Sequence, residues 1–331
     1  MAARPYALWA RAFLSPRGRL LPALGRRLGH HPRLAAGVLT GLRRAPARRL
    51  RSVLYRNVSR PLVERMDARL VVPVAPGSRM VVDTSDTMGR VLASSGVWEP
   101  HVTALLPSLL SPGDVSVDVG AHIGYHALIA SRLVGPTGVV YAIEPSPSAF
   151  GELEENLALN TSSNVRAVRV AAGSSNARAH LVEAPAGNTG EAAIRIVEQE
   201  AASDGEVDVM PVTSIVEEQD VSRLRLVKID VEGFEPEVLA GVRPLLERGC
   251  SFALIVEVHP HRIAATLEAL EHLRTTFSFA SYEVVRVPAD DRFAPAPPPR
   301  PLATFHEVER LSRDKTVNVL LLPEGSRPRW P

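Results

Sequence analysis

Cysteine, lysine and, at the start of the chain, acidic residues are scarce in this sequence. Cys250 is the only cysteine, so the chain can form no intrachain disulfide and offers no cysteine cluster for a metal. Its place before the hydrophobic run at 252–258 predicts a small buried residue rather than a reactive thiol. No apolar stretch approaches the roughly 18 residues that a membrane span needs. We therefore expect a cytoplasmic protein.

The charge is unevenly distributed along the chain. Lys228 and Lys315 are the only lysines, against 36 arginines, and fourteen of these arginines precede the first acidic residue, Glu64. Because the formal net charge is +2, removing those fourteen charges leaves −12 for the rest. An acidic body argues against a nucleic-acid groove within it.

The arginine-rich start resembles an organellar transit peptide or a helix that lies on a membrane surface. It is poor in serine, however, and several prolines would interrupt a long helix: Pro5, Pro16, Pro22, Pro32 and Pro46. We expect residues 1–64 to form a basic arm, either solvated or folded into short helices on the catalytic body. Contact of this arm with a membrane surface is the alternative.

From residue 115 onward, short apolar runs alternate with helical patterns. Strands are expected at 115–119, 139–143, 165–171, 224–230, 252–258, 281–287 and 316–322, with a first helix over about 121–133. Before them come short strands within 70–82 and a helix over 96–110, and between them a strand-rich insertion at 178–212 and a proline-rich loop at 294–301. The pattern predicts an α/β fold with a seven-stranded, doubly wound, mainly parallel sheet, in one domain over residues 65–323 and followed by a tail at 324–331.

Polar residues gather where these strands end. Asp118 lies near the end of the strand at 115–119, Glu144 follows the next strand, Asp230 ends the fourth, and Glu257 with His259 ends the fifth. In a doubly wound sheet, ligands bind beyond the carboxyl ends of the strands. The sequence therefore predicts a ligand site at this edge.

The turn after the first of these strands carries the strongest signal. Gly120 permits a tight turn into the helix, and Gly124 allows that helix to pack closely. A dinucleotide site would show G-x-G-x-x-G and a helix N-terminus that faces a diphosphate. Here Ala121 and His122 follow Gly120, and Asp118 would repel phosphates. An acid in this turn suits a cofactor with cationic groups, such as the ammonium and sulfonium of S-adenosylmethionine.

Two further positions support a cofactor site. Glu144 can accept hydrogen bonds from ribose hydroxyls, a feature that NAD sites and S-adenosylmethionine sites share. Lys228 and Asp230 share one side of an apolar strand, which calls for pairing or functional use of both. A structural ion pair between them is the alternative, and it does not exclude a functional role.

Three blocks of sequence, at 118–130, 140–160 and 227–241, resemble those of the FkbM-type methyltransferase family, and the flanks at 96–102 and 254–259 resemble its flanking segments. The resemblance covers about residues 70–323 and is most specific in "KIDVEG". It implies a class I, Rossmann-like methyltransferase that uses S-adenosylmethionine, typically to methylate hydroxyls on sugars, glycolipids or secondary metabolites.

The resemblance also implies cofactor contacts: Asp118, Gly120 and Ala121 with the methionine portion, Gly124 in the same turn, Glu144 with the ribose, Pro145 and Ala172 near the adenine, and Glu99 at the cofactor mouth. The chain departs from the family pattern at His122, where asparagine is usual, and at His126, where a small hydroxyl residue is common. The fine contacts of this turn therefore do not carry over.

A sugar hydroxyl is a poor nucleophile, and it gains from a base or a metal that removes its proton. We expect Asp230, Glu257 and His259 to face the acceptor, as a base or as a site for Mg²⁺ or Mn²⁺. The spacing from Glu257 to His259 puts both on one side of a strand. The alternative is that Glu257 is a strand-end acid and His259 caps the helix after Pro260.

Three other functions stay open at this stage. A nicotinamide-dependent oxidoreductase would need a phosphate turn that the sequence lacks. An N-methyltransferase acting on nucleic acid should show a D/N-P-P-Y/F motif at the end of the fourth strand, where residues 230–233 read Asp-Val-Glu-Gly. A catalytically inactive cofactor-binding module is the third. We expect a small-molecule or glycan acceptor and no nucleic acid, with specificity set by residues 188–202 and the proline-rich loop; the sequence leaves the oligomeric state open.

Overall fold

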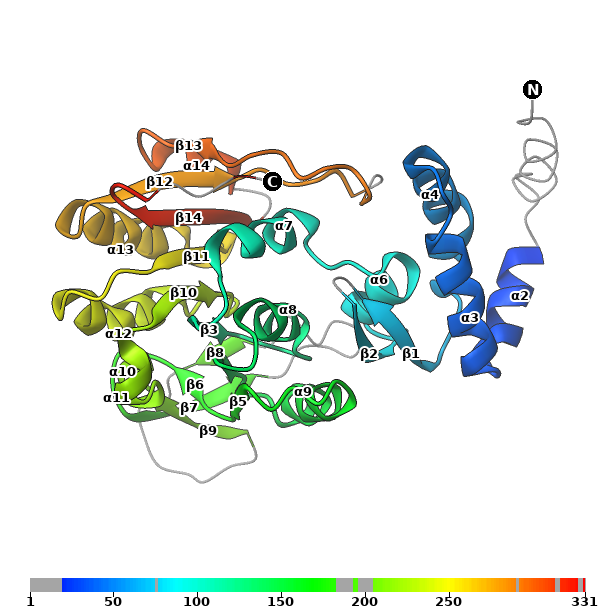
Figure 1. Ribbon diagram of the computed structural model, residues 1–331, viewed down its shortest axis with the longest axis horizontal. Coiled ribbons are helices and arrows are strands. Elements are labelled where there is room, and N and C mark those ends of the chain that lie inside the picture. The colour runs from blue at the N-terminus through cyan, green and yellow to red at the C-terminus, as the bar shows by residue number, and fades with distance from the viewer. Residues whose placement is uncertain are drawn as a thin grey trace. The chain divides into compact units, whose positions relative to one another are not determined.

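The computed structural model of the protein describes residues 20–74, 77–182, 193–195, 205–289, 292–312, 316–326 and 330 (Figure 1). The chain divides into two compact units. Unit 1 comprises residues 1–98, 186–188 and 287–294, and unit 2 comprises residues 99–185, 189–286 and 295–331. The domain limits expected from the sequence, at residues 64/65 and 323/324, stay predictions.

Unit 1 consists mainly of short helices. They are α2 (Leu20–Gly29), α3 (Pro32–Arg43), α4 (Arg48–Leu54), a π-helical turn η1 (Tyr55–Ser59), α5 (Arg60–Val63) and α6 (Thr87–Ser95). Pro32 occupies the first position of α3 and Pro46 precedes α4, the places where proline fits the ends of helices. The expected short helices are therefore present from Leu20 onward. Among the described helices, none has the length and apolar character needed to cross a membrane.

A β-hairpin completes unit 1. Strands β1 (Arg69–Val74) and β2 (Ser78–Asp83) pair antiparallel, with Leu70 opposite Val82 and Val72 opposite Met80. These four apolar side chains are fully buried, which confirms the two short strands expected there. The helix expected over 96–110 is wrong at its start, because Gly96 adopts φ 77° and ends α6.

Unit 2 is built on an eight-stranded sheet with the order β13-β12-β14-β11-β10-β3-β4-β5. Its strands are β3 (Val115–Val119), β4 (Val139–Ile143), β5 (Val165–Val168), β10 (Leu224–Ile229), β11 (Ala253–Val258), β12 (Phe279–Val284), β13 (Arg300–Pro301) and β14 (Val317–Pro323). The strands from β11 to β5 run parallel, and β14 joins β11 antiparallel. The chain order reverses between β3 and β10, so the ligand edge expected for a doubly wound sheet lies at their carboxyl ends. The seven predicted strands are present, and β13 adds a short eighth.

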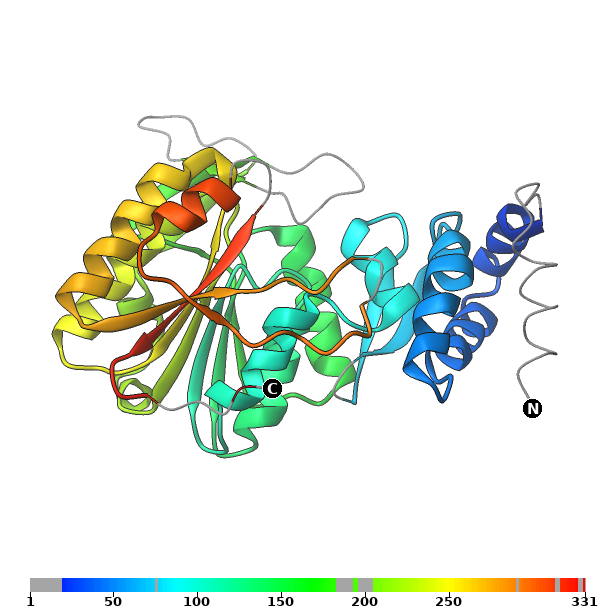
Figure 2. The same cartoon turned by 90° about the horizontal axis from the view of Figure 1, so that it is seen from above.

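Helices cover both faces of this sheet, with α12 and α13 on one face and α7, α8 and α9 on the other (Figure 1, Figure 2). The bounds of the unit 2 helices are α7 (Pro100–Leu109), α8 (Tyr125–Val134), α9 (Pro147–Leu159), α10 (Val212–Ile215), α11 (Glu218–Val221), α12 (Glu235–Glu247), a 3₁₀ turn η3 (Pro260–Arg262), α13 (Ile263–Thr276) and α14 (His306–Leu311). Because strands such as β10 and β11 are buried on both sides, they are nearly continuous apolar runs. Cys250, expected to be buried, is partly exposed and packs against this core.

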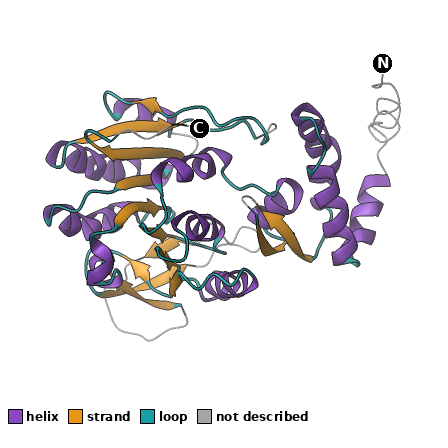
Figure 3. Cartoon of the chain, in the orientation of Figure 1, coloured by secondary structure: helices purple, strands orange, loops and turns teal. Residues whose placement is uncertain are grey.

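A second, smaller sheet holds part of the predicted insertion. It has the order β6-β9-β7-β8, with β6 (Ala171–Ala172), β7 (Ala177–Val182), β8 (Ala193–Arg195) and β9 (Glu206–Met210) (Figure 3). The strand expected over 165–171 therefore ends early, because Val170 donates its N–H back to the Val168 oxygen and the chain changes sheets. Of residues 188–202, only Ala193–Arg195 lie within the described part of the chain.

A network of hydrogen bonds around Asp220 lies at the amino ends of the parallel strands. Asp220, which is 1% exposed, accepts hydrogen bonds from Tyr141 (2.7 Å), Arg166 (3.2 Å) and Arg223 (2.5 Å). Arg223 also donates to backbone oxygens that precede β3 and β4, those of Gly113 and Thr137. This end of the sheet is held together by satisfied polar groups.

Candidate active site

The turn after β3 requires glycine at two points. Gly120 and Gly124 have φ angles of 79° and 90°, and His122 between them has φ 50°. A Cβ on Gly120 would lie 1.8 Å from the backbone oxygen of Asp230, so this turn runs directly against the end of β10. Because Gly124 still belongs to the turn, α8 begins at Tyr125, and the helix start predicted near residue 121 is wrong.

Asp118 lies at the end of β3, beside Lys228 of β10 in the parallel register. The residue is 3% exposed, and neither carboxylate oxygen meets the geometry of a hydrogen bond with a described residue. The Lys228 Nζ is 3.9 Å from Oδ1. Burial, with the charge of Asp230, raises the pKa of Asp118 to about 6, against the opposing effects of the Lys228 ammonium and the backbone N–H of Ala127. Asp118 is therefore a buried carboxylate whose charge is only partly compensated.

Lys228 and Asp230 form the ion pair that the sequence suggested. Nζ of Lys228 is 2.9 Å from Oδ2 of Asp230, and the lysine side chain is only 4% exposed. Burial opposes both charges, but the attraction between them raises the pKa of Lys228 and holds the pKa of Asp230 below its usual value. Lys228 thus stays protonated between two acids, Asp118 and Asp230.

Glu257 ends β11 next to this pair. Burial raises the pKa of Glu257 well above its usual value, and the negative charges of Asp230 and Glu99 and a hydrogen bond with Asp230 add to the shift. Arg286, after β12, approaches Oε1 of Glu257 at 3.4 Å. Glu257 therefore borders the Lys228–Asp230 pair.

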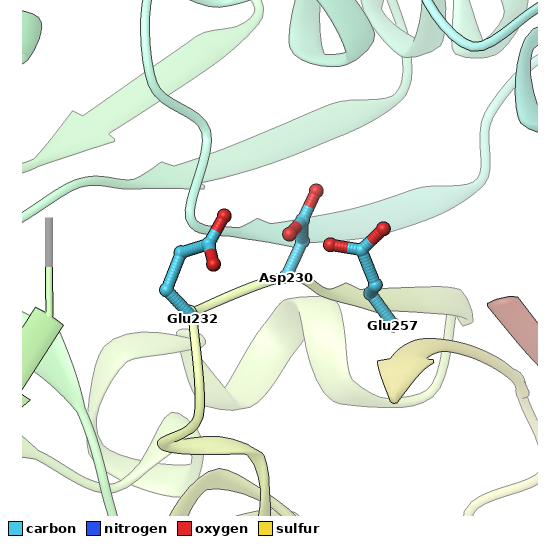
Figure 4. A group of neighbouring side chains, drawn as sticks. All are labelled: Asp230, Glu232 and Glu257. Carbon is cyan, nitrogen blue, oxygen red and sulfur yellow. The ribbon is translucent and has the colours of Figure 1, made fainter. Parts of the chain in front are cut away.

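Asp230, Glu257 and Glu232 gather into one group, with ligand oxygens within 4.8 Å of one another (Figure 4). Figure 4 shows Asp230 between the other two carboxylates. His259 is not a member of this group; its Nε2 lies 3.0 Å from Oε2 of Glu232. The predicted set of Asp230, Glu257 and His259 is thus linked through Glu232, which the sequence analysis did not single out.

Glu99 enters the same cluster from the start of α7. Its Oε1 accepts a hydrogen bond from Asn318 of β14 at 3.3 Å, and Nε2 of His101 and His126 lie 3.8 and 3.9 Å from its oxygens. Burial, followed by the charge of Asp230, raises the pKa of Glu99 to about 7. Burial also lowers the pKa of His126 well below the usual value, so that imidazole is neutral. Glu99 lies within an interior acid–imidazole group.

Glu144 follows β4 and has a rigid position. Its Oε2 accepts the N–H of His122 and its Oε1 accepts the N–H of Ser146, both at 2.9 Å. Burial raises its pKa to about 7, although both N–H donors work against this shift. Glu144 therefore fixes the glycine turn against the end of β4.

The remaining predicted cofactor positions are Ala121, Pro145 and Ala172. The N–H of Ala121 donates to the Ile143 oxygen at 3.0 Å, which holds the turn beside β4. Pro145 is buried directly after Glu144. Ala172 is buried in β6, paired with Met210 in the smaller sheet, and thus outside the eight-stranded sheet.

Backbone strain is concentrated around the same cluster. Of the five non-glycine described residues with positive φ, three are Glu99 (36°), His122 (50°) and Glu232 (53°). Such conformations cost on the order of 1 kcal/mol or more each and occur preferentially at functional sites. The site residues that the sequence analysis missed are Glu232, His101, Asn318 and Arg286; a polar residue inside an apolar strand, as at Asn318, was the available signal.

Comparison with known proteins identifies the family to which the chain belongs. The family model described as "Methyltransferase FkbM domain" matches residues 118–284, about half of the chain. The hexuronic acid methyltransferase AglP of Haloferax volcanii is 30% identical over 184 residues, which are 55% of this chain and 70% of that protein. The 31-O-demethyl-FK506 methyltransferase FkbM of Streptomyces tacrolimicus is 30% identical over 159 residues, 40% of this chain and 61% of that protein.

Among solved structures, methyltransferase FkbM from Methylobacillus flagellatus has a TM-score of 0.41 and 15% identity, over 88% of this chain and 59% of that chain. The family match contains the turn after β3, the Lys228–Asp230 pair and Glu257. The chain belongs to the FkbM family and is an S-adenosylmethionine-dependent methyltransferase.

Proposed function

We propose that this methyltransferase transfers a methyl group to a hydroxyl oxygen of a sugar, a glycolipid or a secondary metabolite. The observation that carries the proposal is the charge arrangement at the carboxyl ends of β3 and β10, where Asp118 and Asp230 flank Lys228. The relatives AglP, a hexuronic acid methyltransferase, and FkbM, a 31-O-demethyl-FK506 methyltransferase, support an oxygen-bearing acceptor.

The residues present fit S-adenosylmethionine. Asp118 offers two buried oxygens without a hydrogen-bond partner among the described residues, which suits the positive charge of the cofactor. Gly120 lets the turn approach the end of β10, where a Cβ would lie 1.8 Å from the backbone oxygen of Asp230. Glu144 is fixed by backbone N–H donors, and its oxygens can each accept one more hydrogen bond, as a ribose diol requires.

S-adenosylmethionine supplies a methyl group on a sulfonium sulfur, already a strong electrophile, so the protein contributes mainly positioning and proton removal. In our proposal Asp118, Gly120, Ala121 and Gly124 hold the methionine end. Glu144 binds the ribose, and Pro145 and Ala172 border the adenine. Glu99 closes the cofactor mouth.

Asp230 is the residue that we assign to the acceptor hydroxyl. Lys228 keeps it ionised, and its side chain is 23% exposed, whereas the Lys228 side chain is 4% exposed. A weak base suffices, because the acceptor oxygen becomes positively charged as its new bond to carbon forms and its proton becomes strongly acidic. Glu257 holds Asp230 through a hydrogen bond, and His259 positions Glu232.

Glu99 is the second candidate for the proton acceptor. Its pKa of about 7, raised by burial, makes it a stronger base than Asp230. The pH dependence of the rate separates the two. With Asp230 as the acceptor, kcat is constant above pH 5, whereas with Glu99 it rises through pH 7.

We propose that turnover needs no divalent cation. Asp230, Glu232 and Glu257 could together hold Mg²⁺ or Mn²⁺, which bind oxygen ligands. The ammonium of Lys228, however, already lies 2.9 Å from Asp230 and provides the positive charge that a metal would bring. Activity should persist after dialysis against EDTA. If activity is lost and Mg²⁺ or Mn²⁺ restores it, a metal ion rather than Lys228 provides the positive charge beside Asp230.

The proposed function is tested by transfer of isotope-labelled methyl from S-adenosylmethionine to a panel of glycosides, glycolipids and hydroxylated metabolites, with product linkage read by mass spectrometry. We expect an O-methyl ether. Labelled N-methyl products would contradict the hydroxyl assignment. Binding of S-adenosylhomocysteine without transfer to any acceptor, in extracts as well as in the panel, would favour an inactive binding module.

A further inference from the structure

The helical segment of unit 1 is rich in arginine and contains no acidic residue before Glu64, which pairs with Arg60 at 2.8 Å. Residues 20–63 contain ten arginines and no aspartate, glutamate or lysine. Eight of these arginines are exposed: Arg26, Arg27, Arg33, Arg44, Arg48, Arg49, Arg56 and Arg60. This segment therefore presents a surface rich in exposed arginines.

The other two arginines have structural roles inside unit 1. Arg43 donates to the backbone oxygens of Pro73 and Leu92, both at 3.1 Å, and burial lowers its pKa to about 10. Arg51 donates to the Ala45 oxygen at 3.2 Å. The fold thus separates the arginines that hold unit 1 together from those that face outward.

Apolar side chains lie among the outward arginines on α3. Leu34 is 58% exposed and Val38 is 38% exposed, one helical turn apart on the same face. A Cβ on Gly37 or Gly41, which share this face, would meet no atom within 4 Å. Ala35 and Leu39, on the opposite face, are fully buried. The outer face of α3 is therefore open among the described residues.

Arginines border this open face. At 100° per residue, Arg33 and Arg44 project to one edge of the arc that contains Leu34 and Val38. An exposed apolar residue next to exposed arginines also occurs on α4 and η1, where Val53, 37% exposed, lies between Arg49 and Arg56. We call the face formed by Arg33, Leu34, Gly37, Val38, Gly41 and Arg44 the α3 outer face.

We propose that the α3 outer face binds the surface of an anionic phospholipid bilayer. Arginines pair with headgroup phosphates, and Leu34 and Val38 enter the boundary between headgroups and acyl chains, as in interfacial amphipathic helices. A nucleic acid would use the arginines but would leave Leu34 and Val38 without an apolar partner. Exposed leucine and valine side chains beside exposed arginines therefore favour a lipid surface as the partner.

This docking would give the enzyme access to acceptors that are carried on lipids. That extension rests on the proposed function, because it assumes transfer to a glycolipid hydroxyl. The binding itself does not rest on it, since it can be measured without S-adenosylmethionine or any acceptor. Failure of either proposal is therefore recognised separately.

The test is co-sedimentation of the full chain with vesicles of phosphatidylcholine alone or with 40% phosphatidylglycerol, at about 0.1 M salt, where charges are screened over roughly 10 Å. We expect binding only to the anionic vesicles. Arg33→Gln with Arg44→Gln should weaken it about 25-fold, from about fivefold per arginine. Leu34→Gln with Val38→Gln should weaken it about tenfold.

Two matched controls belong to the hairpin of unit 1. Val71→Gln removes an equally exposed valine, 38% exposed on β1, and Arg79→Gln removes an exposed arginine on β2. Both should bind like the wild type. Equal binding by wild type and the α3 variants, equal binding to neutral vesicles, or binding to duplex DNA in preference to anionic vesicles would each overturn the proposal.

Discussion

The two ends of the large sheet in unit 2 hold buried acids in opposite states. At the amino ends, Asp220 accepts three hydrogen bonds from Tyr141, Arg166 and Arg223. At the carboxyl ends, Asp118 is equally buried, yet its oxygens have no hydrogen-bond partner among the described residues and one lysine lies 3.9 Å away. The hydrogen bonds of one acid are thus satisfied within the fold, and we propose that the other binds the cofactor.

This difference separates stability from function. A buried acid whose hydrogen bonds are satisfied contributes to folding, and its loss leaves the hydroxyl of Tyr141 without its acceptor and removes one partner each from Arg166 and Arg223. A buried acid without a hydrogen-bond partner lowers the free energy of unfolding of the ligand-free protein. A cationic ligand that pairs with the acid removes this penalty and therefore binds more tightly. Substitutions at the two ends of the sheet should therefore affect different measurements.

The largest effect is expected at Asp230. Asp230→Asn keeps the shape of the side chain but removes the charge that orients the acceptor, so kcat should fall about 10³-fold, within the range for general acid–base groups. The affinity for S-adenosylhomocysteine, measured by calorimetry, should change little. Asp208→Asn, at a side chain that is 70% exposed on β9, is the control and should leave kcat unchanged. Unchanged turnover in Asp230→Asn would remove this residue from the mechanism.

The comparison of the two acids is tested directly by a pair of variants. Asp220→Asn should lower the free energy of unfolding by about 1–3 kcal/mol, because it removes a buried carboxylate that accepts three hydrogen bonds. Asp118→Asn should change it by no more than about 1 kcal/mol but lower cofactor affinity at least about tenfold, through loss of one charge contact. Chemical denaturation gives the free energy of unfolding of each variant, and calorimetry gives its cofactor affinity. If Asp118→Asn lowers the free energy of unfolding but leaves cofactor affinity normal, the carboxyl ends of the strands serve stability rather than cofactor binding, and the account is contradicted.

Two glycines with similar backbone conformations extend the comparison. Gly120 at the carboxyl end and Gly113 at the amino end have φ angles of 79° and 91°. A Cβ would meet the Asp230 oxygen at 1.8 Å in the first case and only Thr137 Oγ1 at 3.7 Å in the second. Gly120→Ala should therefore lower cofactor affinity several-fold, whereas Gly113→Ala should cost only about 1 kcal/mol of stability from the strained φ. Equal affinities would show that the turn tolerates a side chain.

The smallest expected effect is a pH dependence of the ligand-free protein. Burial raises the pKa of Asp118 to about 6 and the pKa values of Glu99, Glu144 and Glu235 to about 7, above usual values of 3.8 and 4.5. The folded state therefore binds more protons than the unfolded state between the usual pKa values and the raised ones, and this contribution to stability is lost progressively from about pH 4 to about pH 7. Tm should fall between pH 5 and pH 8.

The same pKa values predict the opposite trend for the cofactor. As the acids ionise, affinity for the positively charged cofactor should increase between pH 5 and pH 8, and saturating S-adenosylmethionine should reduce the fall in Tm. Thermal unfolding at four pH values, with and without cofactor, checks both trends. A Tm that rises over this interval without ligand would contradict the pKa shifts.

Much of the fold could be predicted from the apolar runs. The strands at 115–119 and 139–143 match β3 and β4 in both ends, because central parallel strands are buried on both faces and end at glycine or an acid. The strand expected over 165–171 failed for a tertiary reason. Its last residue, Ala171, pairs with β9 in another sheet, and no local pattern distinguishes the two partner strands.

The site was predictable where a residue ends a strand of the sheet. Asp118, Glu144, Asp230 and Glu257 follow from that rule, and the structure places them at one edge of the sheet. Asn318 could not be placed this way, because it lies in an antiparallel strand, where the amino half borders the site. His101 and His126 are brought to Glu99 by helix packing, which strand patterns do not report.

A crystal structure of the full chain with S-adenosylhomocysteine tests the central claim most directly. We predict that the amino group of the ligand lies within hydrogen-bond distance of Asp118 and that its ribose hydroxyls contact Glu144. A ligand bound away from the turn at Gly120, or a dinucleotide bound there with its phosphates beside Asp118, would contradict the account.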